Sequence, residues 1–217
     1  MKNMNHVADH IKAVFFDHDD TLVATIEPVW KLHKHVAREH YGKDLTDKEL
    51  HEHWGKPLKQ MISLLYGTDN PETAITHISR YHRMYIKKFF DTTIPVLARL
   101  HKESKLIGVV TATSRQYLEN DLDRHPGARE LIDYTQVEDD TQFHKPDPRV
   151  FQPAITWLTA QEVKPEEVLY IGDSFLDAQA ALQAGFNFLG VETGLVTARQ
   201  FQKRGVISIP NLSNLLG

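Results

Sequence analysis

The stretch that decides the fold is Ala13–Thr21 (AVFFDHDDT), in which four apolar residues run straight into a polar loop. An unbroken apolar run of this length is typical of a strand buried on both faces, as in a parallel sheet, although periodicity alone leaves a helix open. Similar runs follow at 106–110, 168–171 and 186–191, with a weaker one at 206–209. Helical patterns separate these runs, and the alternation predicts an α/β fold with a doubly wound, Rossmann-like parallel sheet.

Residues 24–91 break this alternation, because they contain helical patterns and no convincing strand. Thr46 and Glu49 form a capping box for one helix, and Asn70 followed by proline begins another. A segment of this length is about the smallest that holds a core of its own. We therefore expect two domains: an α/β core made of residues 1–23 and 92–217, and an inserted, all-helical domain made of residues 24–91.

Polar residues gather where the predicted strands end. In an open α/β sheet, ligands bind in the crevice outside the carboxyl ends of the strands, so these residues should converge on one crevice. They come from four separate segments of the chain, which are Asp17–Thr21, Thr111–Ala112, Lys145 and Asp173–Asp177. This convergence predicts a single functional site built from distant parts of the sequence.

The residue types in this crevice point to phosphate chemistry. Clustered carboxylates repel one another unless a cation lies among them, and with no Cys in the chain oxygen ligands dominate, which favours Mg²⁺. A Thr hydroxyl, backbone N–H groups and a Lys ammonium are the usual partners of a phosphate group. An Asp beside Mg²⁺ and Lys stays ionised and can attack phosphorus, while a second Asp two residues further on can transfer protons.

These segments resemble the four motifs of the haloacid dehalogenase superfamily of phosphohydrolases. The first motif, D-x-D-x-T, matches Asp17–Thr21, and the second, an apolar strand ending in Thr or Ser, ends at Thr111. The third is a Lys-Pro pair at Lys145, and the fourth, G-D-S-x-x-D, matches Gly172–Asp177. The helical insert lies where members with a small helical (type C1) cap carry theirs, and the general pattern is similar to the phosphoglycolate phosphatase-like group.

The resemblance implies a role for each residue of the crevice. Asp17 would be the nucleophile that forms an aspartyl-phosphate, and Asp19 would be the general acid and base. Thr111 and Lys145 would act on the phosphoryl group, with Ala112 beside them in the phosphate-binding turn. The acid at Asp19 also disfavours dehalogenase and phosphonatase chemistry, because those members lack it.

The resemblance also implies the ligands of the metal. Mg²⁺ would be bound by the carboxylates of Asp17 and Asp173 and by the backbone carbonyl of Asp19. Asp177 and Ser174 would support these ligands from behind, with Asp177 acting on the metal shell or on Lys145.

Three positions carry open questions. Asp20 and His144 stand where most members have glycine; Asp tolerates the left-handed or turn conformation better than most residues, so the first turn should survive. Lys56 lies between two predicted helices of the insert, where capped members place a substrate-specificity loop. It either reaches an anionic group on the substrate or is simply solvated.

The sequence therefore predicts Mg²⁺-dependent hydrolysis of a small-molecule phosphomonoester. A sugar phosphomutase using the same Asp17 and Asp19 pair remains an alternative, although Thr21 stands where such mutases tend to carry Val. A non-catalytic binding protein of the same superfamily is the other alternative.

Composition narrows the partners. The chain has 217 residues and a net charge of −4, which argues against nucleic-acid binding. No segment approaches the length of a membrane span, and Met1–His10 lacks the apolar run of a signal peptide. We expect a soluble, cytoplasmic protein, monomeric or homodimeric, whose partner is a small-molecule phosphate ester.

Overall fold

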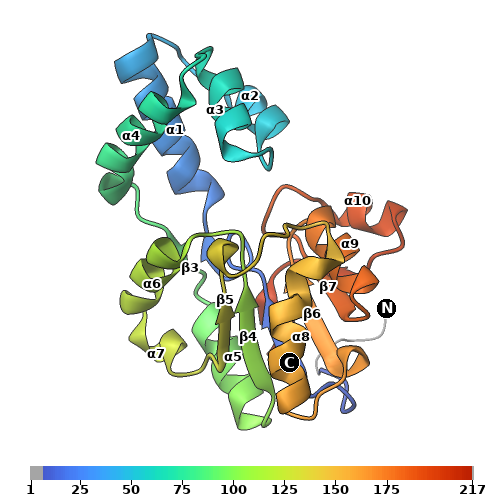
Figure 1. Cartoon of the computed structure of the whole chain (residues 1–217). Coiled ribbons are helices and arrows are strands. Elements are labelled where there is room, and N and C mark those ends of the chain that lie inside the picture. The colour runs from blue at the N-terminus through green and yellow to red at the C-terminus, as the bar shows by residue number, and fades with distance from the viewer. Residues whose placement is uncertain (1–6, 217) are drawn as a thin grey trace. The chain divides into compact units, whose positions relative to one another are not determined.

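The computed structural model describes residues 7–216 and places a parallel, six-stranded sheet at the centre of the α/β part (Figure 1). The strand order is β5-β4-β1-β6-β7-β8, and each neighbouring pair is parallel. The strands are β1 (Ala13–Phe16), β4 (Leu106–Val110), β5 (Tyr134–Gln136), β6 (Val168–Gly172), β7 (Asn187–Val191) and β8 (Ser208–Ile209). The predicted doubly wound α/β fold is confirmed, and β5 is an addition that the apolar pattern did not indicate.

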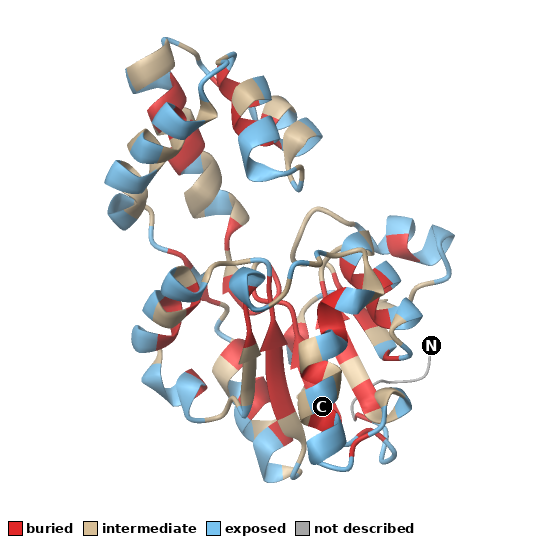
Figure 2. Ribbon diagram, in the orientation of Figure 1, coloured by how far each residue is buried: buried red, intermediate tan, exposed pale blue. Residues whose placement is uncertain are grey.

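Helices cover both faces of this sheet, which explains the unbroken apolar runs. Along β1, Val14 and Phe16 contribute to one hydrophobic cluster, while Ala13 and Phe15 contribute to the other, and all four are fully buried. Figure 2 shows the central strands buried between the more exposed helices. These helices are α5 (Thr93–Lys102), α6 (Arg115–Asp123), α7 (Pro126–Arg129), α8 (Gln152–Ala160), α9 (Phe175–Gln183) and α10 (Ala198–Lys203).

The described chain divides into two compact units, one formed by residues 7–24 and 88–216 and the other by residues 25–87. The expectation that 24–91 contains no strand is wrong, because β3 (Lys88–Phe89) pairs antiparallel with β2 (Val23–Ala24). Two residues are too short for a recognisable pattern, and Phe89 is buried in the core of the α/β unit. The helical unit thus ends at residue 87, whereas the sequence suggested that it extends to residue 91.

The helical unit has its own core. Its helices are α1 (Ile26–Tyr41), α2 (Asp47–His53), α3 (Leu58–Tyr66) and α4 (Pro71–Tyr81), followed by a 3₁₀ turn at His82–Met84. The predicted capping box is present at Thr46, and Asn70 caps α4 through its side chain. The buried residues that hold these helices together include Leu32, Val36, Leu50, Ile62 and Leu65. No helix in the described part of the chain combines the length and apolar character that crossing a membrane requires.

Acid should destabilise the helical unit through His33, which is 2% exposed and whose Nδ1 lies 2.7 Å from the Tyr66 hydroxyl. Burial lowers the pKa of His33 from 6.5 to about 4, so the unfolded chain takes up a proton at a higher pH than the folded one. The contribution of His33 to the free energy of unfolding therefore falls by about 3 kcal/mol as the pH falls from about 6.5 to about 4. Urea unfolding followed by tryptophan fluorescence should show that His33→Phe removes this component, whereas Tyr66→Phe retains it, because burial is its cause. Equal pH dependence in His33→Phe and the unchanged protein would contradict the assignment.

Candidate active site

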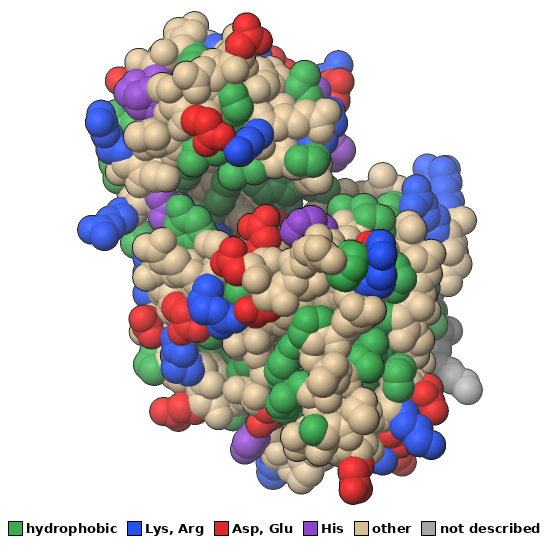
Figure 3. All heavy atoms as spheres, viewed as in Figure 1, with side chains coloured by type: hydrophobic (Ala, Val, Ile, Leu, Met, Phe, Trp, Pro, Cys, Tyr) green, Lys and Arg blue, Asp and Glu red, His purple; other side chains and the backbone are tan. Residues whose placement is uncertain are grey.

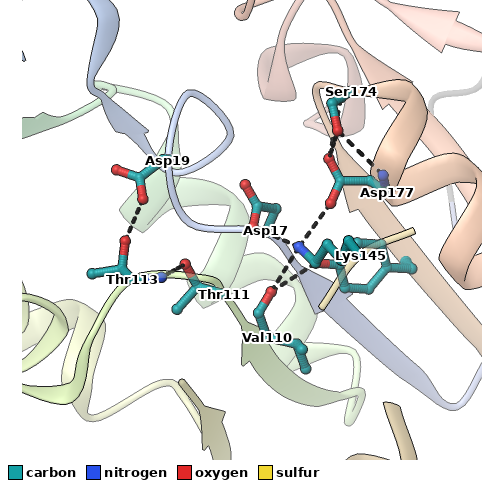
Figure 4. A network of polar contacts seen from close by, with 9 residues as sticks. Asp17, Asp19, Val110, Thr111, Thr113, Lys145, Ser174 and Asp177 are labelled. Carbon is teal, nitrogen blue, oxygen red and sulfur yellow. Dashed lines mark hydrogen bonds and ion pairs between the residues drawn. The ribbon is translucent and has the colours of Figure 1, made fainter. Parts of the chain in front are cut away.

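The site lies at the carboxyl ends of three adjacent strands (Figure 4). Strand β1 lies between β4 and β6, with Phe16 opposite Val109 and Ile171, so the residues that follow each strand emerge side by side. The backbone N–H of Asp17 continues the ladder by donating to the Ile171 carbonyl at 2.8 Å. The parallel register therefore brings Asp17, Thr111 and Asp173 to one edge of the sheet.

Lys145 is the centre of the polar network. Its Nζ lies 2.7 Å from an oxygen of Asp17 and 2.7 Å from an oxygen of Asp177, so one ammonium joins two carboxylates. It also donates to the Tyr170 hydroxyl at 2.6 Å and to the Val110 carbonyl at 3.1 Å, and that hydroxyl donates to the same carbonyl at 2.7 Å. The lysine thus contacts four oxygen atoms, which come from the end of β1, from β4, from β6 and from α9 (Phe175–Gln183).

Burial and mutual repulsion set the acidities of the site. Burial raises the pKa of Asp17 to about 7, against the lowering effect of Lys145. Burial also raises the pKa of Asp173 well above its ordinary value, and the charges of Asp177, Asp17 and Asp20 add to the effect. The Asp17 and Asp177 carboxylates raise the pKa of Lys145 and outweigh the opposing effect of its burial. The site holds more negative charge than one lysine balances.

The donor set suits a hard divalent cation. Oxygen atoms of Asp17, Asp173 and Asp177 all lie within 4.8 Å of one another. Asp177 already directs one oxygen to Lys145 and accepts at the other from the Ser174 hydroxyl, as part of the capping box that begins α9. Asp17 and Asp173 are therefore the carboxylates that could bind Mg²⁺, which prefers oxygen ligands, while Asp177 and Ser174 support them.

The loop after β7 contacts two residues of the site, Asp20 and Asp173, and the sequence did not indicate this loop. The Thr193 hydroxyl donates to the Asp20 carbonyl at 2.5 Å, and Gly194 lies so close to Asp173 that a Cβ at this position would overlap its carboxylate. Asp20 adopts a left-handed backbone conformation, with φ of 53°, and is 4% exposed. The expected turn thus survives with Asp in place of glycine, and its backbone is anchored by this loop.

The turn after β4 carries the predicted phosphate-binding residues. Thr111 is 5% exposed and its N–H donates to the Gln136 carbonyl of β5 at 3.0 Å, while Ala112 is exposed. The Thr111 hydroxyl accepts from the N–H of Thr113 at 3.0 Å. The Thr113 hydroxyl in turn donates to the Asp19 carboxylate, which Figure 4 shows directed toward Thr113 and away from Lys145.

Lys56 and His144 are the two remaining predicted positions. Lys56 belongs to the helical unit, where its Nζ lies 2.8 Å from Nδ1 of His53. His144 is exposed and, with Glu138, lines the same small hollow as the phosphate-binding turn and Lys145.

Sequence reasoning missed Tyr170, Thr113 and Gly194. Tyr170 offered a signal, because a hydroxyl in a buried strand needs a partner, and here that partner is Lys145. Thr113 and Gly194 offered none, because their importance depends on which distant residue they meet.

Known proteins resemble this chain along most of its length. The family model for haloacid dehalogenase-like hydrolases matches residues 14–191, which include all four motif segments. The pyrophosphatase PpaX of Bacillus mycoides (strain KBAB4) is 27% identical over 183 residues, covering 83% of this chain and 83% of that protein. A solved Bacteroides fragilis protein assigned to the haloacid dehalogenase-like hydrolases has a TM-score of 0.80 and 30% identity, covering 94% of this chain and 99% of that chain. A Thermotoga maritima protein assigned as a β-phosphoglucomutase, at 22% identity and a TM-score of 0.78, covers 95% of this chain and 97% of that chain and shares the fold.

The parallel sheet and the aspartate–lysine cluster at its carboxyl edge define a hydrolytic α/β enzyme. The chain belongs to the haloacid dehalogenase-like hydrolases. The resemblance that its four motifs suggested is confirmed.

Proposed function

We propose that the protein is a Mg²⁺-dependent phosphatase that hydrolyses a small-molecule phosphomonoester through an aspartyl-phosphate on Asp17. The observation that carries this proposal is the buried contact of Asp17 with Lys145, at 2.7 Å, beside the Asp173 carboxylate. A carboxylate placed between a lysine and a candidate metal ligand is oriented for attack, and the same lysine can stabilise negative charge on a phosphoryl group.

The proposed reaction has two steps. A carboxylate oxygen of Asp17 attacks phosphorus, the bond to the leaving oxygen breaks, and that oxygen takes a proton from Asp19. Asp19 then removes a proton from water, whose oxygen attacks phosphorus and releases inorganic phosphate and the Asp17 carboxylate. Lys145 and Thr111 would hold the phosphoryl oxygens, with Asp17, the Asp19 carbonyl and Asp173 as the metal ligands. Bound Mg²⁺ would offset the negative charge that the phosphoryl group brings to the acidic site.

The substrate and setting are part of the proposal. Pyrophosphate joins the phosphate monoesters as a candidate substrate, because the Bacillus relative is a pyrophosphatase. Lys56 would contact an anionic group of the substrate. We propose action in the cytoplasm, as a monomer or homodimer, without nucleic-acid partners; the face drawn in Figure 3 shows acidic and basic side chains interspersed rather than a broad basic patch.

A panel of phosphate compounds, with and without Mg²⁺, tests the proposal. Release of inorganic phosphate from at least one monoester or from pyrophosphate is expected with Mg²⁺, and a loss of at least about 100-fold is expected in excess chelator. A phosphomutase would instead convert a sugar phosphate into its isomer with little free phosphate. Full activity in chelator would contradict the metal requirement, and no turnover of any compound would favour a binding protein.

A further inference from the structure

We propose that Thr113 is a positioning residue for Asp19, the general acid and base of the proposed function on which this inference rests. The Thr113 hydroxyl donates to Oδ2 of the Asp19 carboxylate. Thr113 is half-buried and lies two residues after Thr111, outside the motif residues that the sequence indicated. It contacts Asp19, and the proposed reaction gives it no role at the phosphoryl group.

The backbone of Thr113 is fixed on both sides, so its hydroxyl has a defined position. Its N–H donates to the Thr111 hydroxyl at 3.0 Å, and its carbonyl accepts from the N–H of Glu138 at 3.3 Å. Ser114 follows directly as the N-cap residue of α6. The Ser114 carbonyl accepts from the N–H groups of Tyr117 and Leu118 in that helix. The turn after β4 is therefore a rigid support from which a side chain can hold another in place.

A second contact ties the same loop to the same support. His18, between the two motif aspartates, is fully buried, and its Nε2 lies 3.1 Å from Oδ2 of Asp121 on α6. Asp121 is 3% exposed and also accepts from Arg124 at 3.1 Å. Successive side chains of the loop, those of His18 and Asp19, thus both reach the segment formed by the β4 turn and α6, which restrains the loop around Asp19.

The restraint matters for proton transfer rather than for attack at phosphorus. A misplaced acid slows only those steps in which it delivers or removes a proton, and small displacements of a catalytic group lower rates strongly. Loss of the Thr113 hydroxyl should therefore slow cleavage of an ester whose leaving group must be protonated more than cleavage of an ester whose leaving group departs as an anion.

Two esters separate these steps. 4-Nitrophenyl phosphate has a leaving group that departs without a proton, so the initial burst of nitrophenolate reports attack by Asp17. An alkyl phosphate needs protonation of its leaving oxygen. In Thr113→Val, kcat for the alkyl ester should fall about 10–100-fold, whereas the burst rate should change by less than about 3-fold. Inhibition by inorganic phosphate should stay unchanged, and Thr113→Ser should restore the alkyl rate, because it keeps the hydroxyl.

Thr156→Val is the matched control, since Thr156 lies on α8 and its hydroxyl donates to the Gln152 carbonyl within that helix. A fall in the 4-nitrophenyl burst rate as large as the fall in kcat for the alkyl ester, or no fall in either, would overturn the role of Thr113 and leave the proposed function standing. Absence of phosphate release from every compound of the panel in the unchanged protein would overturn the proposed function and this role with it.

Discussion

Asp17→Asn should abolish turnover of every phosphate compound that the unchanged protein hydrolyses, with a loss of at least about 10⁴-fold, because an amide cannot form the acyl phosphate. The variant should also be at least as stable as the unchanged protein without metal. Burial raises the pKa of Asp17 to about 7, so the folded protein holds this carboxyl protonated up to a higher pH than the unfolded chain does. Ionised Asp17 therefore lowers stability as pH rises from about 4 to about 7, and asparagine removes that penalty.

Two measurements check this expectation together. Phosphate release should disappear, and metal-free thermal unfolding at pH 8 should occur at the same or a higher temperature, with the difference shrinking toward pH 4. Asp139→Asn, which changes an exposed acid, is the matched control and should leave both quantities unchanged. Near-normal phosphate release by Asp17→Asn would refute Asp17 as nucleophile, and a large loss of stability at pH 8 would refute the electrostatic description of the site.

Lys145→Met should move stability in the opposite direction while also removing most activity. Methionine keeps much of the side-chain length but leaves the Asp17 and Asp177 carboxylates without the ammonium that lies 2.7 Å from each. Removing one partner of a buried ion pair destabilises proteins by about 3–5 kcal/mol. Loss of a charged donor to a reacting group lowers kcat by about 10²–10³-fold.

Urea unfolding and steady-state kinetics measure the two effects of Lys145→Met. Lys102→Met is the matched control, since this lysine is exposed at the end of α5. Unchanged stability in Lys145→Met would mean that the carboxylates do not depend on the lysine. Unchanged kcat would remove Lys145 from the proposed reaction. Opposite shifts of stability in Asp17→Asn and Lys145→Met are the signature of a site with excess negative charge.

The sequence predicted the parallel sheet because both faces of its strands are covered, which leaves continuous apolar runs such as 13–16 that are easily recognised. Strand β5, with the sequence Tyr-Thr-Gln, was missed because it is short and only partly buried. Strand β3 was missed for the same reason, and its residues were assigned to the helical insert.

The site could be predicted as far as strand ends determine it. Asp17, Thr111 and Asp173 directly follow strands, so the register of β1 with its neighbours is enough to bring them together. Thr113 and Gly194 escaped prediction because a turn and a loop, rather than a strand, determine which residues they meet. Their contacts with Asp19 and Asp173 follow only from the three-dimensional path of those segments.

The position of β1 in the sheet has a consequence for how the protein is made. This strand lies between β4 and β6, yet the whole helical unit, residues 25–87, and α5 separate it in the sequence from Leu106, where β4 begins. At about 5–20 residues per second, β1 waits roughly 5–20 seconds on the ribosome before its first neighbour exists. The helical unit, which has a core of its own, is synthesised during that interval. The strand that precedes the nucleophile is thus the first strand of this sheet to be translated, and it gains a neighbouring strand only after the helical unit has been made.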